Sequence, residues 1–589
     1  MNLNSLPKLY RTIRPLRRSQ LAWRSWYIFL RKLGLYARAS APIETHSPLS
    51  SEWIDAIPLI HANSIEEQSS LVDRLRRGEL KLLNEVRTIG SDPIDWNLSP
   101  RKTGILWALT LHYHAWLYDL ARIASGSTPE SADAERLFQR YLLNWMERCD
   151  LGRSGSATLA WHPFAVATRI GWWIRCYGLL GSARFTSWTG LNSQFLKCLW
   201  THAEFLSKRV EWDLRGNHLI RDALGLAWAG RFFDDAQSRR WTALSNAIVT
   251  EQIVEQILPD GSHFERSPMY HIHVMEDIST LAALTQDAPL RERLHAVLQR
   301  MAEYLSWMRH PDLNLPLFND GGFNGVPTPA GMLTLCSEIA LTANRRDPDS
   351  ELPSGARLFP DAGVMVFHGQ PWSIFFDAGK VSADYQPAHA HADTLALECS
   401  YKGARLFVDP GTYDYDDGPR RSYDRSTAAH NTVYIDGRDS SELWHIFRVG
   451  RRAMPSIVDG GTRTELDFCA SHDGYSHLPG APTHIRRIST GENTPLTIVD
   501  IIEGSGRHDL QGGWLLAPDW SVNALENGWI LSNADRKVRV EITADRAVSL
   551  SVSAAFYHPE YGREYAVSRL GWNWGGLLPI KVTTTMTGC

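Results

Sequence analysis

The sequence predicts a multidomain α+β protein in which stacked helix pairs come first and an antiparallel β-sandwich follows. A chain of 589 residues is too long for one hydrophobic core and should divide into at least two domains. In the first half of the chain, apolar residues recur at helical spacing. In the second half they alternate with polar residues, which is the period of β-strands.

Residues 1–64 form a basic, aromatic N-terminal segment. Its first forty residues contain nine Lys or Arg residues and no Asp or Glu. Such a segment either touches anionic lipid as an amphipathic helix or docks on the protein through its aromatic face, with its basic face in water. The residues that carry this pattern are Lys8, Arg11, Arg14, Arg17, Arg18, Trp23, Trp26, Tyr27 and Phe29.

Composition and targeting signals restrict the class of protein. The net charge of −4 excludes a protein that coats nucleic acid, so an anionic partner must meet a local basic site. The seven cysteines lack CxxC spacing and are odd in number, which argues against a disulfide framework. The apolar run Trp26–Leu30 is too short for a signal-peptide core, and no segment has the length of a membrane span. We therefore expect a cytoplasmic location, with the cell envelope or periplasm as the alternative.

Residues 65–343 carry the helical pattern, and we expect paired helices that stack into a toroid or solenoid. In the stretch 105–120, apolar and aromatic residues recur every three or four positions. Short polar or Gly-containing turns separate the stretches that follow. These are 136–148, 163–180, 192–210, 218–232, 242–258, 271–285 and 289–308.

The polar segment 344–355 contains two prolines and no periodic pattern, so it is the predicted linker. Residues 356–589 are expected to form the β-sandwich. Alternation is clear at Leu395–Cys399 and at Val538–Ile542. The pair Asn527-Gly528 has the composition of a hairpin turn.

A group of imidazoles and a carboxylate marks the strand-rich half. His389 and His391 precede one strand, Asp409 ends the next apolar run, and His430 comes just before a third strand. Two imidazoles and a carboxylate are suitable zinc ligands, and we assign His391, Asp409 and His430 to a zinc site. The alternative is a buried hydrogen-bond network without metal. His389 either adds a ligand or acts as a base.

Two further motifs lie in the helical half. In Gly216-Asn217-His218, Asn217 is placed to cap the helix that follows. In the second motif, Tyr270 follows Arg266 by four residues, and a nearby cation would lower the phenol pKa from its usual value of about 10. Such a tyrosine can exchange protons near neutral pH.

Together these motifs resemble the heparinase II/III family of polysaccharide lyases over most of the chain. The resemblance implies an incomplete (α/α) toroid before the β-sandwich, with the substrate cleft between the two. It rests on five motifs in order. These are Gly216-Asn217-His218-Leu219, the run Leu258 to Tyr270 (LPDGSHFERSPMY), His389-Ala390-His391-Ala392-Asp393, Val408-Asp409-Pro410-Gly411-Thr412-Tyr413 and Thr427-Ala428-Ala429-His430-Asn431-Thr432.

The same resemblance assigns roles to single residues. Asn217 and His218 would neutralise a uronate carboxylate, Tyr270 would act as a proton donor or base, and His389 would act as a second base. A lyase removes the proton on C5 and expels the glycosidic oxygen from C4. Hydrogen bonds to the carboxylate stabilise the enolate-like state more than the ground state, which lowers the barrier. The zinc ion would organise the loops of the β half and orient His389.

Arginine side chains are candidates for binding the anionic polysaccharide. Arg266 lies beside Tyr270 in sequence, and Arg420, Arg421 and Arg425 lie between Asp409 and His430. Guanidinium groups bind carboxylate and sulfate through paired hydrogen bonds. The alternative is that the latter three are solvated loop arginines.

Arg221 is a departure from the family pattern. It stands where several relatives have an acidic or amide residue, and Asp222 follows it. This departure leaves the substrate class open. The oligomeric state is not predicted.

Two other functions fit parts of the pattern. A glycoside hydrolase on a similar toroid would use two carboxylates about 5–10 Å apart, and Asp213, Asp260 and Glu265 are available. A non-catalytic polysaccharide-binding protein of polymer biosynthesis would show affinity without turnover.

Overall fold

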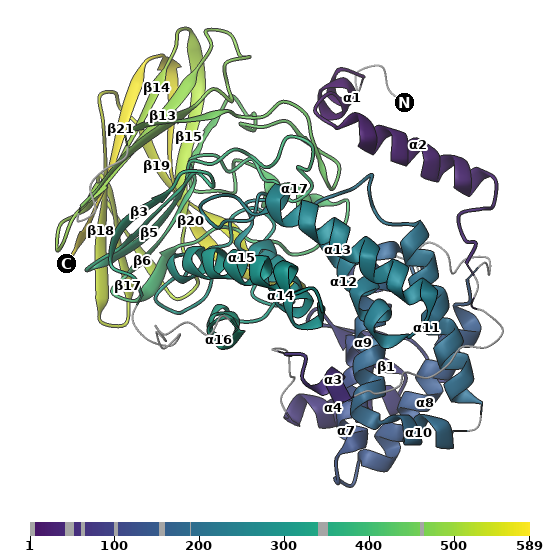
Figure 1. Cartoon of the computed structure of the whole chain (residues 1–589). Helices are drawn as coiled ribbons and strands as arrows, with labels where there is room; N and C mark the ends of the chain where they lie inside the picture. Colours follow the sequence, from purple (N-terminus) through teal and green to yellow (C-terminus); the bar gives the residue numbers. More distant parts are fainter. Residues whose placement is uncertain are drawn as a thin grey trace. The chain divides into compact units, whose positions relative to one another are not determined.

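The computed structural model describes residues 6–39, 41, 52–59, 65–98, 104–151, 159–188, 190–339, 352–459 and 465–589. The chain forms two compact units, each made of separate segments (Figure 1). We call residues 17–255 with 274–298 the helical unit. The strand-rich unit comprises residues 1–16, 256–273 and 299–589. Helices in the N-terminal part and antiparallel sheets in the C-terminal part confirm the α+β class.

The helical unit is organised around α9 (Pro163–Leu180), which is buried on nearly all sides. Pro163 occupies the first turn, where its missing N–H costs nothing. The helices that pack most extensively on α9 are α7 (Ala115–Ser125), α11 (Leu191–Lys208) and α12 (Asn217–Phe232). The remaining helices are α2 (Arg18–Lys32), α3 (Glu52–Asp55), α4 (Ile65–Arg76), α6 (Ile105–Leu111), α8 (Ser131–Arg148), α10 (Ser182–Ser187), α13 (Ala236–Gln256), α14 (Pro268–Leu284) and α15 (Ala288–Trp307).

Seven helical stretches predicted from residue 136 onward correspond to α8, α9 and α11–α15. The stretch 105–120 is not one helix, because the chain breaks between α6 and α7. There His114 has a left-handed φ of 67°, and its Nδ1 accepts a hydrogen bond of 2.8 Å from the Trp173 indole. The short hairpin β1 (Glu79–Leu82) and β2 (Glu85–Thr88) was not predicted. No described helix has the length and apolarity needed to cross a membrane.

The strand-rich unit contains three larger sheets whose described strand pairs are all antiparallel. The largest described hydrophobic cluster of this unit draws residues from all three sheets. The five-stranded sheet orders β3 (Gly355–Phe359), β4 (Val364–His368), β5 (Trp372–Asp377), β6 (Leu397–Tyr401) and β7 (Ala404–Phe407). The four-stranded sheet orders β19 (Ser549–Glu560), β20 (Arg563–Leu577), β15 (Arg507–Leu515) and β8 (Val433–Ile435).

The third sheet has eight strands. Its order is β11 (Pro455–Asp459), β12 (Leu466–His472), β13 (Thr483–Thr490), β14 (Leu496–Glu503), β21 (Ile580–Gly588), β18 (Arg536–Ala544), β17 (Gly528–Asn533) and β16 (Ser521–Leu525). Outside these sheets lie α1 (Leu6–Ile13), α16 (Pro329–Ile339), α17 (Pro419–Arg425) and the pair β9 (Leu443–Trp444) and β10 (Arg448–Val449).

Strand burial follows the sequence pattern in β18 and departs from it in β6. In β18, Val538, Val540 and Ile542 are buried and alternate with more exposed residues, as predicted. Every residue of β6 is buried, so its polar positions face protein rather than water. Leu395 lies before this strand with a left-handed φ of 66°, so the predicted alternation from Leu395 was wrong at its start.

The predicted hairpin is present, with its turn one residue earlier than expected. Leu525 pairs with Gly528, so Glu526 and Asn527 form the two-residue loop. Gly528 opens β17 with a φ of 157°, and a Cβ atom there would lie 1.8 Å from the carbonyl oxygen of Val540. The glycine is therefore required by close approach of two strands rather than by the turn itself.

The predicted domain boundaries at 65–343, 344–355 and 356–589 stay predictions, because most of the linker lies outside the described residues. The two compact units divide the chain elsewhere: their boundaries fall between α1 and α2, at the last residue of α13, and inside α14 and α15. The segment 256–273 thus belongs to the strand-rich unit although it precedes the predicted linker. It carries Tyr270.

Candidate active site

Tyr270 and His389 lie face to face in the strand-rich unit. Their ring centroids are 3.7 Å apart, and their planes differ by 26°. Tyr270 belongs to the first turn of α14, and His389 lies on the loop between β5 and β6. Two residues that are 119 positions apart in sequence thus present a phenol and an imidazole at one place, as acid–base chemistry requires.

A chain of hydroxyl groups continues from Tyr270. Its hydroxyl shares a hydrogen bond of 3.0 Å with that of Tyr415, which shares another of 2.7 Å with Tyr561. Burial raises the pKa of Tyr270 well above its ordinary value, the charges of Tyr561 and Asp320 raise it further, and the Tyr415 hydrogen bond lowers it. At neutral pH, Tyr270 is therefore a phenol and a proton donor.

The proposed effect of Arg266 on Tyr270 was wrong. The Arg266 guanidinium donates a hydrogen bond to the carbonyl oxygen of Ala362, and the pKa of Tyr270 is raised rather than lowered. Arg266 also has a left-handed φ of 62°, so the segment does not continue as the helix in which residues four apart would face each other. Its partly buried guanidinium ties the loop to Ala362, and its predicted role in binding substrate stays a prediction.

Asp320 connects the residues that the sequence motifs identified. Its carboxylate accepts hydrogen bonds of 2.9 Å from His389 Nδ1 and from His391 Nε2, and it forms a buried ion pair with Arg421. Burial alone would raise the pKa of Asp320, but Arg421 and the two histidine hydrogen bonds hold it well below its usual range. Asp320 is therefore an anion that fixes both imidazole rings.

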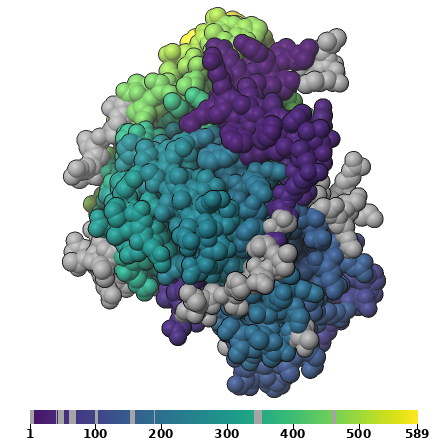
Figure 2. All heavy atoms as spheres, turned by 45° about the vertical axis from the view of Figure 1, so that its right-hand side comes forward, coloured from purple at the N-terminus to yellow at the C-terminus, as the bar shows by residue number. Residues whose placement is uncertain are grey.

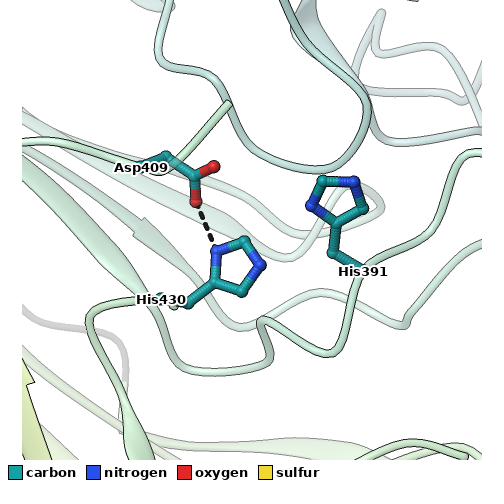
Figure 3. A group of neighbouring side chains, drawn as sticks. All are labelled: His391, Asp409 and His430. Carbon is teal, nitrogen blue, oxygen red and sulfur yellow. Dashed lines mark hydrogen bonds and ion pairs between the residues drawn. The ribbon is translucent and has the colours of Figure 1, made fainter. Parts of the chain in front are cut away.

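His391, Asp409 and His430 come together as predicted (Figure 3). All three are buried, and one ligand atom from each lies within 4.8 Å of the others. His430 Nδ1 donates a hydrogen bond of 2.7 Å to Asp409, and burial lowers the pKa of His391 to about 3. Among the described residues, His391 Nδ1 and His430 Nε2 have no hydrogen-bond partner, although both are buried.

This donor set fits a metal ion. Buried nitrogen atoms without a partner are costly, and a cation would satisfy both. Asp320 binds the Nε2 side of His391, which leaves the Nδ1 lone pair facing the group. Burial and the charge of Glu398 raise the pKa of Asp409, which means that its ionised form is unfavourable there. A divalent cation would stabilise that ionised carboxylate.

Asn217 and His218 belong to the helical unit and begin α12. The helix is capped by Gly216, so the prediction that Asn217 is the N-cap was wrong. At the helix start, Asn217 is buried and the His218 side chain is partly exposed. His218 packs against the Phe164 ring at 4.9 Å and donates through Nδ1 to Glu211 at 2.9 Å. Glu211, which sequence motifs did not identify, therefore fixes the tautomer of His218.

The three arginines of α17 have different environments. Arg420 is exposed, pairs with Glu564 at 2.9 Å and stacks on the Tyr413 ring at 4.1 Å. Arg421 and Arg425 are buried, so neither is a solvated loop residue. Arg421 binds Asp320, and Arg425 donates to the carbonyl oxygens of Ala390, His445 and Ile446. For Arg421 and Arg425, a role in holding the loops replaces the predicted role as direct polysaccharide contacts, whereas for Arg420 that role stays a prediction.

Comparisons with protein families cover most of the chain. Residues 82–325 match the family model described as heparinase II/III N-terminus, and residues 351–584 match the model described as heparinase II/III-like, C-terminal. A heparin-sulfate lyase from Bacteroides thetaiotaomicron is 25% identical over 389 residues, covering 58% of this chain and 53% of the relative. Another from Bacteroides stercoris is 23% identical over 466 residues, covering 70% and 64%. The matches span about half to two thirds of these relatives.

Solved structures share the fold. A crystal structure of heparinase III aligns with 100% of this chain and 92% of its own, with a TM-score of 0.76 and 20% identity. A heparan sulfate lyase from Pedobacter heparinus aligns with 96% of this chain and 88% of its own, with a TM-score of 0.58 and 16% identity.

Proposed function

The chain belongs to the heparinase II/III-like family, and we propose that it is a polysaccharide lyase that cleaves a uronic-acid-containing polymer by β-elimination. The observation that carries the proposal is the stacked pair of Tyr270 and His389, held between a hydroxyl chain and the Asp320 carboxylate. Its curated relatives are heparin-sulfate lyases, which supports the same reaction class. The incomplete (α/α) toroid and the β-sandwich are the finer architecture that we propose with it.

We assign the base to His389 and the acid to Tyr270. Because Asp320 accepts the Nδ1 proton of His389, Nε2 is left as the basic nitrogen that takes the C5 proton. Glu265 lies 3.5 Å from Nε2, where its charge stabilises the imidazolium that forms. Tyr270 keeps its proton at neutral pH and delivers it to the departing C4 oxygen. The product carries a C4–C5 double bond.

Asn217 and His218 neutralise the uronate carboxylate in this proposal. Proton removal at C5 adds negative charge beside that carboxylate, so hydrogen bonds to it strengthen as the enolate-like state forms. Glu211 supports this role because it orients the His218 imidazole. Arg420 is the one exposed candidate for an anionic group among the four arginines considered, although it already pairs with Glu564.

A glycoside hydrolase is less well supported by the same residues. Asp260 accepts hydrogen bonds from the amides of Asp361 and Ala362 and from the Ser262 hydroxyl, so it serves to hold its loop. Glu265 faces His389 instead of a second carboxylate available for glycosidic catalysis.

The test is incubation of the purified protein with heparan sulfate, heparin, chondroitin sulfate, hyaluronan and alginate. We expect heparan sulfate to be cleaved, with a product that absorbs in the near ultraviolet and contains no solvent oxygen. A saturated product that contains solvent oxygen would overturn elimination in favour of hydrolysis. Binding without turnover on every polymer would instead indicate a polysaccharide-binding protein. Cleavage of alginate alone would retain the reaction and change the substrate class.

Zinc is the metal that we propose for His391, Asp409 and His430, because two imidazoles and a carboxylate are typical zinc donors. When bound, the ion would cross-link the loops that carry these residues. Asp320 contacts both His391 and His389. An ion that fixes His391 would therefore also help to fix the orientation of His389, the proposed base, through the Asp320 carboxylate.

We expect the purified protein to contain about one equivalent of zinc and to melt at lower temperature after chelation. His391→Ala and His430→Ala should each lose the metal, whereas His445→Ala is the control because that imidazole is exposed and outside the group. Elemental analysis and thermal unfolding measure the two effects. Less than about a tenth of an equivalent of zinc, with an unchanged melting temperature in chelator, would contradict the site.

A further inference from the structure

The short helix α1 docks through its polar side and exposes its apolar side. Arg11 forms a double hydrogen bond with Glu442 at 2.8 and 2.7 Å, and Thr12 accepts one of 2.9 Å from the Trp444 indole. Leu6, Tyr10 and Ile13 share one helix face and are 48%, 65% and 37% exposed. An amphipathic helix that packs on a protein normally buries this apolar face.

The longer helix α2 also carries large apolar side chains toward water. Tyr27 and Leu30 are buried, and the Tyr27 hydroxyl donates to the carbonyl oxygen of Val210 at 2.6 Å, so this side docks on the helical unit. Docking through the aromatic face, one of the two alternatives for this segment, therefore applies to Tyr27 and not to every aromatic residue of α2. Trp26, Ile28 and Phe29 remain about half exposed, and the Trp26 and Phe29 rings lie 5.7 Å apart.

The charge on both helices is entirely positive. Neither α1 nor α2 contains an acidic residue. Arg18 and Lys32 are exposed on α2, and neither pairs with a carboxylate in the part of the chain that the structure describes. At 100° per residue, both lie on the side of the helix opposite Tyr27, together with Leu21 and Phe29. Figure 2 shows the N-terminal part of the chain, in purple, at the molecular surface.

We propose that α1 and α2, each through its own exposed apolar side chains, bind the surface of an anionic phospholipid membrane. Aromatic and aliphatic side chains enter the boundary between headgroups and acyl chains, while Arg and Lys contact the lipid phosphates. Trp26 is of the residue type that favours this boundary. A partner protein with an acidic, apolar groove would need matching shape, whereas a fluid anionic surface needs only the exposed apolar side chains and the cations that both helices provide.

The test is cosedimentation of the full-length protein with vesicles of phosphatidylcholine alone or mixed with phosphatidylglycerol. We expect binding to the anionic vesicles that weakens as salt is added, and little binding to neutral ones. Trp26→Glu combined with Phe29→Glu should weaken binding at least about tenfold, and Tyr10→Glu should weaken it less. Polymer cleavage in solution should not change, because none of these residues belongs to the proposed active site.

A matched control replaces two exposed apolar residues outside α1 and α2 by glutamate. Val254 and Leu577 are 73% and 67% exposed and lie on α13 and β20, so Val254→Glu combined with Leu577→Glu should bind vesicles as the unaltered protein does. Equal loss in the control and the α2 variant would overturn the proposal, as would absence of binding to anionic vesicles. Light scattering that shows a dimer dissociated by the α2 changes, without lipid binding, would assign this face to a second copy of the chain.

Discussion

Replacement of Tyr270 by Phe is expected to lower the rate of polymer cleavage by about a hundredfold to ten-thousandfold, the range for loss of a positioned acid or base. The change removes one oxygen and keeps the ring that stacks on His389 at 3.7 Å. Because the aromatic contact survives, the fold should be retained. The effect should fall on kcat, since the phenol proton is transferred only as the C4 oxygen leaves.

The control for this experiment is Tyr565→Phe, which removes a hydroxyl from a half-exposed strand residue outside the site. Steady-state absorbance assays on the polymer that the protein cleaves give kcat and KM for both variants, and circular dichroism checks their fold. A Tyr270→Phe variant that keeps more than about a tenth of the original kcat would exclude the phenol as an essential acid.

Tyr415→Phe would distinguish the effect of holding the Tyr270 hydroxyl in place from the effect of proton donation by Tyr270. This variant keeps the Tyr270 phenol and removes the hydroxyl 3.0 Å away, together with the link to Tyr561. We expect a smaller decrease in kcat than for Tyr270→Phe. An equal decrease would show that the proton passes through the hydroxyl chain.

The sequence predicted the helix and strand classes because periodicity records which face of an element is buried. The stretches that became α9 and α12 repeat an apolar pattern over many turns, and β18 alternates strictly. Periodicity gave the wrong prediction where a local contact determines the backbone conformation. His114 breaks a helical pattern by taking a left-handed φ and binding Trp173, an arrangement that periodicity does not record.

The candidate site was predictable only where residues sit in recognisable motifs. Tyr270, His389 and the three metal-site residues were identified in this way. Asp320 was missed because its partners are 69 to 101 positions away in sequence, and a lone Asp within Phe318-Asn319-Asp320-Gly321 reads as a turn residue. Arg421 was misassigned for the related reason that sequence does not show which arginines are buried against a carboxylate.

Replacement of Asp320 by Asn is expected to reduce the free energy of unfolding by about 3–5 kcal/mol, because Arg421 would remain buried without its counter-ion. Cleavage should also fall, on the order of a thousandfold, since the amide no longer fixes the Nδ1–H tautomer of His389. Chemical denaturation and the absorbance assay measure the two effects separately.

Two variants test whether burial of the Arg421 pair causes the loss. The exposed pair of Asp467 with Arg487 has comparable two-point geometry, so Asp467→Asn should cost less than about 1 kcal/mol. Adding Arg421→Met to Asp320→Asn removes the unpaired cation and should recover part of the stability without recovering cleavage. A single Asp320→Asn variant with nearly unchanged stability and activity would contradict the role of Asp320.

The pH dependence supplies an independent check with a definite sign. The pKa of Asp320 is held well below its ordinary range in the folded protein, so the unfolded chain takes up a proton at higher pH than the folded one. The stabilisation by this carboxylate is therefore complete above about pH 4 and is lost as the pH falls through the folded pKa. The difference in unfolding free energy between the unaltered protein and Asp320→Asn should be constant near neutral pH and should narrow only under acid conditions. A difference that narrows toward alkaline pH would mean that another group, and not this buried anion, produces the stabilisation.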